Sequence, residues 1–175
     1  MYYLSGMNAS QICLRSIELT DAPLLLRWEN DPKAWASSGS YNPLSSAFVE
    51  AYVLSSNVSL VERGQMSLVI QMQDEAVGYV QVSDYNAVER RAALGVYIAE
   101  LHRGRGIATE AIRELIQYLR QRMRCEHLYA TMLESNTISQ HLFLKLGFVH
   151  TASLPHWQWT GERYEALYYY QLWSE

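Results

Sequence analysis

Residues 101–112 read Leu-His-Arg-Gly-Arg-Gly-Ile-Ala-Thr-Glu-Ala-Ile, with two glycines and two arginines ahead of an apolar periodic run. Gly104 and Gly106 allow the backbone to bend so that successive N–H groups point into one concavity. A helix that begins here adds partial positive charge, and Arg103 and Arg105 add formal charge. The stretch therefore predicts a phosphate or pyrophosphate site at a helix N-terminus. The alternative is a plain glycine-rich turn with solvated arginines.

The same stretch differs from two common phosphate-binding motifs. No Gly-Lys-Ser/Thr follows it, as a P-loop requires, and the full Gly-x-Gly-x-x-Gly spacing of dinucleotide-binding folds is missing. A P-loop nucleotide site and a Rossmann-type site are therefore excluded.

Around this loop the hydrophobic pattern alternates between strand and helix periods. Strands are expected over residues 11–17, 66–72, 77–83, 92–99, 127–132, 148–154 and 165–173. Helices are expected from a cap at Thr20-Asp21 to about Asn30, around 48–53, from Ile107 through Leu119, and from the cap Asn136 to Gly147. The order β-α-α-β-β-β-α-β-α-β-β predicts an α+β fold with a mostly antiparallel sheet.

Composition limits the classes of protein that fit. The chain has 175 residues, 49% of them hydrophobic, and is expected to form a single domain over residues 1–175. A net charge of −4 argues against a general nucleic-acid binder. No run approaches the ~20 apolar residues of a membrane span, and no signal peptide is recognisable. Cys13 and Cys125 form neither a disulfide framework nor a zinc site, so a cytoplasmic protein without metal is expected.

Several motifs together resemble the GNAT superfamily of N-acetyltransferases. Arg103-x-x-Gly106-x-Ala108 resembles its acyl-CoA pyrophosphate motif. About thirty residues on, Asn136-x-x-Ser139-x-x-Leu142-Phe143-x-Lys145-x-Gly147-Phe148 resembles its second signature. The branch of ribosomal-protein N-terminal and spermidine acetyltransferases is similar at Leu14-Arg15, Thr20-Asp21-Ala22, Trp28-Glu-Asn-Asp-Pro32 and Arg90-Arg91-Ala92.

The resemblance implies a GNAT-like mixed sheet of about seven strands with helices on both faces, and acetyl-CoA as co-substrate. It implies that the strand before the loop splays from its neighbour, with Gly95 permitting a bulge. Pantetheine then contacts the backbone of Val96 and Ile98, and Asn136, which is otherwise a simple helix cap, reaches its arm. The implied pyrophosphate contacts are Arg103, Gly104, Arg105, Gly106, Ile107 and Ala108.

The usual catalytic groups are missing from their places. The position at which much of the superfamily carries a proton-donating tyrosine holds Phe143, which then lies beside the cofactor. Ala92 and Ala93 stand where many relatives carry a glutamate. The candidates that remain are Tyr97 on the splayed strand, Glu29 and Asp31 after the first helix, and Glu134. For Asp31 helix capping is the alternative role, and for Glu134 a solvated charge.

Two functions are compatible with these residues. One is an N-acetyltransferase in which a primary amine of a small molecule or a protein N-terminus attacks the thioester directly. The other is a catalytically idle acyl-CoA-binding or sensing module. The expected protein is a monomer or homodimer that binds neither nucleic acid nor membrane. Aromatic residues that are candidates to hold a cationic amine are Trp28, Trp35, Tyr41, Trp157, Trp159 and Tyr164.

Overall fold

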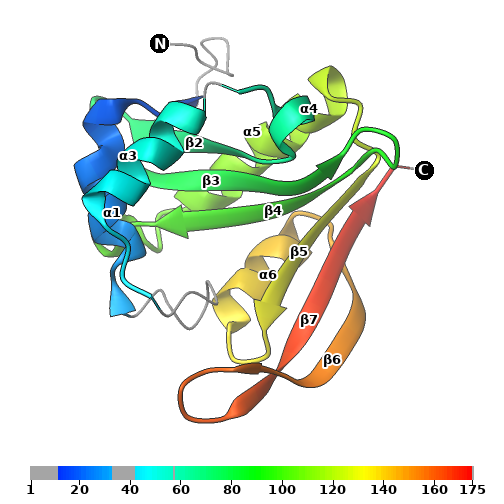
Figure 1. The fold of residues 1–175 in the computed structure, drawn as a ribbon. Helices are drawn as coiled ribbons and strands as arrows, with labels where there is room; N and C mark the ends of the chain where they lie inside the picture. Colours follow the sequence, from blue (N-terminus) through cyan, green and yellow to red (C-terminus); the bar gives the residue numbers. More distant parts are fainter. Residues whose placement is uncertain (1–11, 33–41, 57, 175) are drawn as a thin grey trace. The chain divides into compact units, whose positions relative to one another are not determined.

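The computed structural model describes residues 12–32, 42–56 and 58–174 (Figure 1). The chain divides into two compact units. Unit 1 comprises residues 1–17, 58–130 and 172–175, and unit 2 comprises residues 18–57 and 131–171. The single domain expected over residues 1–175 stays a prediction.

Seven strands form a sheet in the order β1-β2-β3-β4-β5-β7-β6. Strands β1 to β4 pair antiparallel in sequence order, β5 pairs parallel with β4, and β6 and β7 form an antiparallel hairpin. This confirms the α+β class and the mostly antiparallel sheet. The bounds are β1 (Ile12–Ser16), β2 (Met66–Met72), β3 (Glu75–Asn86), β4 (Arg91–Ile98), β5 (His127–Leu133), β6 (Val149–Trp159) and β7 (Tyr164–Trp173).

Unit 1 is built around helix α5 (Ile107–Arg122), which crosses one face of strands β1 to β4 (Figure 1). The sequence predicts an apolar stripe on this helix, and five of its residues are buried: Ile107, Ala111, Ile112, Leu115 and Leu119. Two further residues of the predicted stripe, Ala108 and Ile116, are half-buried. Opposing strand residues that are almost fully buried include Leu14, Ile70, Val77, Val80 and Val82. Because each such side chain contributes about 1.5–3 kcal/mol on burial, this interface anchors the start of α5 and the loop that precedes it.

Gly78 of β3 lies tightly against the backbone of β4. A Cβ atom there would lie 2.2 Å from the carbonyl oxygen of Tyr97, so only glycine fits. The bulge expected at Gly95 is wrong, because the β3–β4 register runs without interruption from Gly78↔Ile98 to Ser83↔Ala93. The register shifts instead between Ser83 and Asn86, near the β3–β4 turn.

A short helix, α4 (Leu60–Arg63), was not predicted. The Ser59 side chain accepts a hydrogen bond from the Glu62 N–H, and the Ser59 hydroxyl donates to the Glu62 carboxylate. Gly64 ends the helix in the left-handed region with φ 69°. The Ser-x-x-Glu spacing of a capping box was present in the sequence and was the available signal.

The described residues of unit 2 include the 3-10 turn η1 (Leu19–Asp21) and the helices α1 (Ala22–Glu29), α3 (Ser46–Ser55) and α6 (Thr137–Lys145). Helices α1 and α3 pack together through residues that include Leu25, Trp28, Val49 and Val53. The Asn30 side chain joins the end of α1 to the segment before α3, because it donates to the Leu44 carbonyl and accepts from the Leu44 N–H.

Two boundaries in unit 2 differ from expectation. Asp21 does not cap α1 through its side chain. Its carboxylate instead accepts from the Glu18 N–H at 2.9 Å and closes η1. Strand β6 continues past Leu154 to Trp159, through a register irregularity between Leu154 and Gln158. Pro155 lies in that segment, and proline is tolerated on an edge strand at such an irregularity.

Candidate active site

The glycine-rich loop leads directly into α5 in unit 1. Gly104 and Gly106 have φ angles of 74° and 79°, the left-handed region that favours glycine. Gly106 is the N-cap of α5, and no side chain caps this helix end. The first backbone N–H groups of α5 therefore point out of the helix end beside Arg103 and Arg105, as an anion site requires.

The strand before the loop presents its backbone to one side. In an antiparallel pair of strands, every second residue directs its N–H and C=O groups to the partner strand. The Ala99 N–H donates to the Val77 carbonyl, so Ala99, Tyr97 and Gly95 direct their backbone groups to β3. Val96 and Ile98 direct theirs away from β3. The pairing of β4 with β5 covers only Arg91 to Ala93. We call the outward backbone groups of Val96 and Ile98 the outer edge of β4.

The Arg103 side chain turns back onto β4. Its Nε atom donates to the Ile98 carbonyl at 2.9 Å, and its guanidinium carbon lies 5.8 Å from the centroid of the Tyr97 ring. Tyr97 in turn stacks on Tyr79, with centroids 5.4 Å apart. Arg103 thus joins the outer edge of β4 to the glycine-rich loop, and its positive charge lies where the loop begins.

His102 is a site neighbour that the sequence reasoning missed. Its side chain is 13% exposed, and its Nε2 atom lies 3.3 Å from the Glu75 carboxylate at the start of β3. This contact fixes the 3-10 turn η2 (Glu100–His102) immediately before the glycine-rich loop. A lone histidine beside a charged loop gave no signal of its partner, which lies 27 residues earlier in the chain.

In unit 2, Glu134 and Asn136 lie on the β5–α6 connection and Phe143 lies in α6. Asn136 caps α6, because its Oδ1 atom accepts from the Ser139 N–H at 3.1 Å. Phe143 is 3% exposed and packs edge-to-face on Phe148, with centroids 4.9 Å apart. The alternative role of Asn136 as a helix cap is confirmed, and Phe143 is a core residue of this unit.

Glu134 is exposed on the β5–α6 connection, and its backbone N–H donates to the Ala166 carbonyl at 2.9 Å. Desolvation raises the pKa of the Tyr168 phenol, as does a hydrogen bond between that phenol and the Glu134 carboxylate. The catalytic role of Glu134 stays a prediction, with a solvated charge as its alternative.

Glu165 of β7 positions the same connection and was missed by the sequence reasoning. It is 8% exposed, accepts from the Ser135 N–H at 3.2 Å, and forms a salt bridge with Arg163 at 2.9 Å. Hydrogen bonding from the Ser135 side chain, and then from Arg163, lowers the pKa of the Glu165 carboxyl, although burial opposes this. Ser135 directly precedes Asn136, so Glu165 sets where α6 begins.

The variant Glu165→Gln is expected to lose stability in a pH-dependent manner. Because the folded state lowers the Glu165 pKa from 4.5, the charge stabilises the fold above that pH and ceases to do so as the pH falls through the folded value. At neutral pH we expect a loss of about 1.5–3 kcal/mol. Thermal unfolding of the wild type and the variant from about pH 7 to about pH 3 measures the difference in their stability. A stability difference that stays the same at acid pH would contradict the prediction.

The remaining candidates also lie in unit 2. Glu29 ends α1, and Asp31 follows that helix with its N–H donating to the Trp28 carbonyl. Both are half-buried and both have interaction partners.

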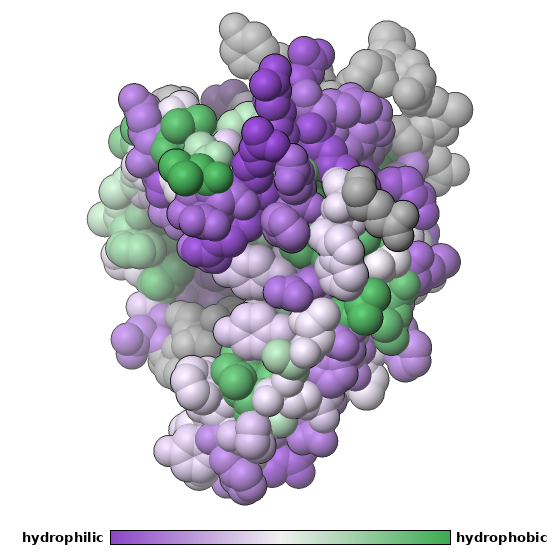
Figure 2. All heavy atoms as spheres, turned by 90° about the vertical axis from the view of Figure 1, so that its right-hand side faces the viewer, coloured by the Kyte–Doolittle hydropathy of each residue, from purple (hydrophilic) through white to green (hydrophobic). Residues whose placement is uncertain are grey.

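Of the aromatic candidates, Trp28 is buried in the α1–α3 core, and Trp35 and Tyr41 lie outside the described residues. Trp157, Trp159 and Tyr164 are exposed on the β6–β7 hairpin, and Trp159 and Tyr164 contact each other with centroids 5.2 Å apart. The lower part of the face in Figure 2, where this hairpin lies, carries mostly side chains of intermediate hydropathy.

Within residues 12–32, 42–56 and 58–174 there is no group of three or more histidine, cysteine or acidic side chains placed to bind a metal ion. Every helix in this part of the chain is too short or too polar to cross a bilayer.

Comparisons with known proteins agree on one family. Residues 11–149 match the model of the acetyltransferase (GNAT) domain. The chain is 25% identical over 152 residues to spermidine N(1)-acetyltransferase of Escherichia coli K12, covering 85% of this chain and 78% of that protein.

Two solved structures share the fold. The spermidine N-acetyltransferase of Vibrio cholerae, in complex with CoA and spermine, superposes with a TM-score of 0.87 at 20% identity over 93% of this chain and 95% of that one. The ribosomal L7/L12 alpha-N-protein acetyltransferase, in complex with CoA, gives 0.84 at 17% identity over 98% of both chains. With the family match spanning most of its length, the chain belongs to the GNAT acetyltransferase family.

Proposed function

We propose that this acetyltransferase uses acetyl-CoA to acetylate a primary amine of a small molecule or a protein N-terminus, by direct attack of the neutral nitrogen on the thioester. The observation that carries the proposal is the geometry of residues 103–108. Two left-handed glycines, each preceded by an arginine, lead there into a helix end without a side-chain cap. This arrangement supports a pyrophosphate contact by Arg103, Gly104, Arg105, Gly106, Ile107 and Ala108.

The pantetheine arm follows from the same loop. An extended ligand that leaves the loop toward β4 meets the outward N–H and C=O groups of Val96 and Ile98, and can bond to them as an added strand does. Such an N–H is also a suitable donor to the oxyanion of the tetrahedral intermediate. Asn136 of unit 2 stays a predicted contact of the pantetheine arm, and its Oδ1 atom already caps α6.

The catalytic groups are proposed from position. Tyr97 lies on β4 next to Val96 and is a candidate proton donor to the departing thiolate. Glu29, Asp31 and Glu134 are candidate bases that would take up the amine proton through water. A CoA thiol has a pKa close to that of a cysteine thiol, about 8.5. Its thiolate can therefore also depart without a fixed acid.

The idle acyl-CoA-binding module stays a second candidate, because Phe143 is buried and apolar where much of the superfamily has a tyrosine. Measurement of CoA release across a panel of amines separates the two. Spermidine and a peptide with a free N-terminus are the first members of that panel, since they match the named substrates of relatives. Turnover with any amine supports the enzyme, and acetyl-CoA binding without turnover supports the module.

Removal of the charges at Glu29 and Asp31 tests the acceptor side. If these carboxylates hold a cationic amine, Glu29→Gln and Asp31→Asn should each raise the KM for the amine by about two- to fivefold. The KM for acetyl-CoA should stay within twofold. Initial-rate kinetics with each substrate varied in turn give both constants, and equal losses for the two substrates would instead indicate a folding role.

A further inference from the structure

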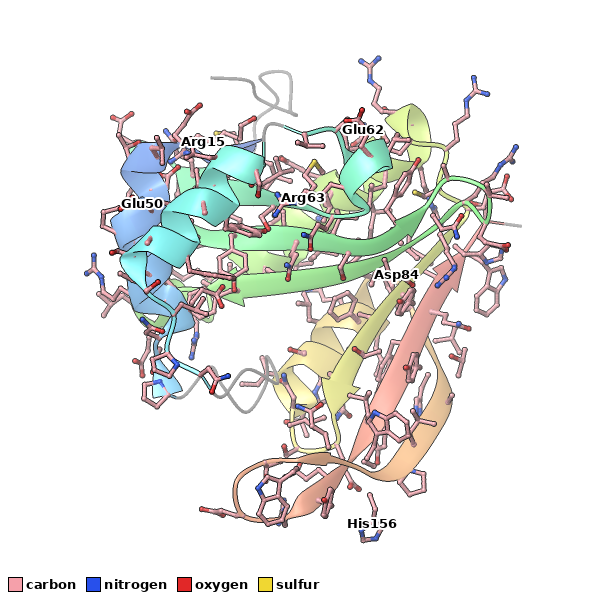
Figure 3. All side chains as sticks on the ribbon, viewed as in Figure 1. Arg15, Glu50, Glu62, Arg63, Asp84 and His156 are labelled. Carbon is pink, nitrogen blue, oxygen red and sulfur yellow. The ribbon has the colours of Figure 1, made fainter. Side chains whose placement is uncertain are left out.

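Three polar side chains from three neighbouring strands meet at the start of β4 in unit 1. Asp84 of β3 accepts at its Oδ2 atom from the Arg91 guanidinium of β4, with which it forms a salt bridge. The same oxygen accepts from the Tyr129 hydroxyl of β5 at 2.7 Å. Figure 3 labels Asp84 at this junction. These residues lie outside the cofactor loop and are not among the catalytic candidates above.

A small residue between the strands makes this contact possible. Tyr129 lies opposite Ala93 in the β4–β5 pairing, and Ser83, the neighbour of Asp84, lies opposite Ala93 on β3. The Tyr129 side chain therefore crosses β4 at Ala93, where a methyl group leaves room for it. The place where the family resemblance expects a glutamate on β4 is thus reached by a carboxylate from the adjacent strand.

The cluster of Asp84, Arg91 and Tyr129 lies near the N-terminal end of β4. An acetyl group carried along the outer edge of β4 would point toward this end. This step rests on the proposed function, with the pyrophosphate at residues 103–108 and pantetheine along Ile98 and Val96. The thioester then points toward Ala93, about 10 Å along the strand from Val96. Because side chains alternate along a strand, Arg91, Ala93 and Tyr97 share one face of β4, and the Asp84–Tyr129 pair lies on that face.

The cluster is also accessible to solvent. The Asp84 side chain is 47% exposed and that of Arg91 is 41% exposed, so water and an amine can approach the carboxylate. The two hydrogen bonds hold the carboxylate in one orientation. The competing interpretation is an ordinary surface ion pair, which contributes about 0–1 kcal/mol to stability and nothing to catalysis.

We propose that Asp84 and Tyr129 together form the proton acceptor for acetyl transfer. The amine nitrogen forms a C–N bond to the thioester carbon, and the resulting ammonium gives its proton to the Tyr129 oxygen while the Tyr129 proton passes to the Asp84 carboxylate. The tetrahedral intermediate then collapses, the C–S bond breaks, and the thiolate leaves with the bonding electron pair. The proton on Asp84 returns through Tyr129 or water to the thiolate, so the products are the amide and the thiol.

The test compares Asp84→Asn and Tyr129→Phe with the wild-type protein. Asp84 has φ 48°, a conformation that asparagine also tolerates, so Asp84→Asn removes the charge without new backbone strain. We expect kcat to fall at least tenfold in each variant, with the KM for acetyl-CoA within twofold. The double variant should lose no more than the worse single one, because the two groups act as one unit.

The matched control is Glu126→Gln. Glu126 forms a comparable exposed ion pair with Arg90, next to Arg91, but has no tyrosine partner on β5 in the described structure. Its kinetics should equal those of the wild type. The proposal is overturned if the wild type acetylates an amine while Asp84→Asn or Tyr129→Phe keeps kcat within twofold. If the wild type binds acetyl-CoA but turns over no amine, the proposed function fails, and the role of Asp84 and Tyr129 fails with it. If the wild type turns over an amine and the variants do so equally well, only the role of Asp84 and Tyr129 fails.

Discussion

The variant Gly106→Glu is expected to bind acetyl-CoA at least tenfold more weakly than the wild type while it remains folded. Gly106 has φ 79°, and a side chain in this left-handed region costs about 1–2 kcal/mol. A Cβ atom there meets nothing within 4 Å, so the side chain is accommodated without a steric clash. The added carboxylate, however, stands at the N-cap of α5 and repels the phosphates that this helix end attracts. Isothermal titration calorimetry with acetyl-CoA measures the loss.

Gly161→Glu is the control for backbone strain. Gly161 also has a positive φ, 99°, and open space around its Cβ position, but it lies in the β6–β7 turn of unit 2. The two variants should show similar losses of thermal stability, and only Gly106→Glu should lose affinity. Unchanged affinity in Gly106→Glu would show that the loop does not bind the pyrophosphate.

The cofactor loop could be predicted from the sequence because everything that defines it is local. Residues 101–112 contain the turn glycines, the charges and the first turn of α5, and no distant contact is needed to recognise them. The buried stripe of α5 was predictable for the same reason, since it depends on the helical period alone.

The residues that were missed depend on contacts between distant parts of the chain. Asp84 meets Tyr129 across 45 residues, and Glu165 meets Ser135 across 30. A carboxylate in a sequence gives no indication of which backbone or hydroxyl will lie beside it after folding. Gly78 illustrates the same limit, because its need for glycine arises from the Tyr97 carbonyl on the adjacent strand.

Gly95 shows how a sound local inference can fail. A glycine inside a strand suggests a bulge, yet a Cβ atom at Gly95 would meet only the Gln81 side chain, at 3.8 Å. The end of the β4–β5 pairing at Ala93 needs no bulge against β3, because a strand can leave one neighbour while it keeps its register with the other.

The largest loss of stability is expected for Phe143→Ala. The ring is 3% exposed and contacts Phe148 edge-to-face, so its removal takes away both burial and an aromatic contact. Phenylalanine-to-alanine changes in a core cost about 3–5 kcal/mol. For a protein of this size each kcal/mol lowers Tm by about 2–4 °C. Circular dichroism melts give the Tm, and a change of less than about 1 kcal/mol would show that the site is not a core position.

Phe143→Tyr then decides whether this position is also catalytic. If the ring edge is enclosed by the core of unit 2, the added hydroxyl is buried without a partner and costs about 1–3 kcal/mol, with no effect on the pH–rate profile. If the edge instead faces the cofactor, the hydroxyl supplies the missing proton donor, so turnover is unchanged or raised and Tm is kept. The edge-to-face contact with Phe148 and the 3% exposure favour the first outcome. A rise in kcat with an unchanged Tm would contradict it and return Phe143 to the active site.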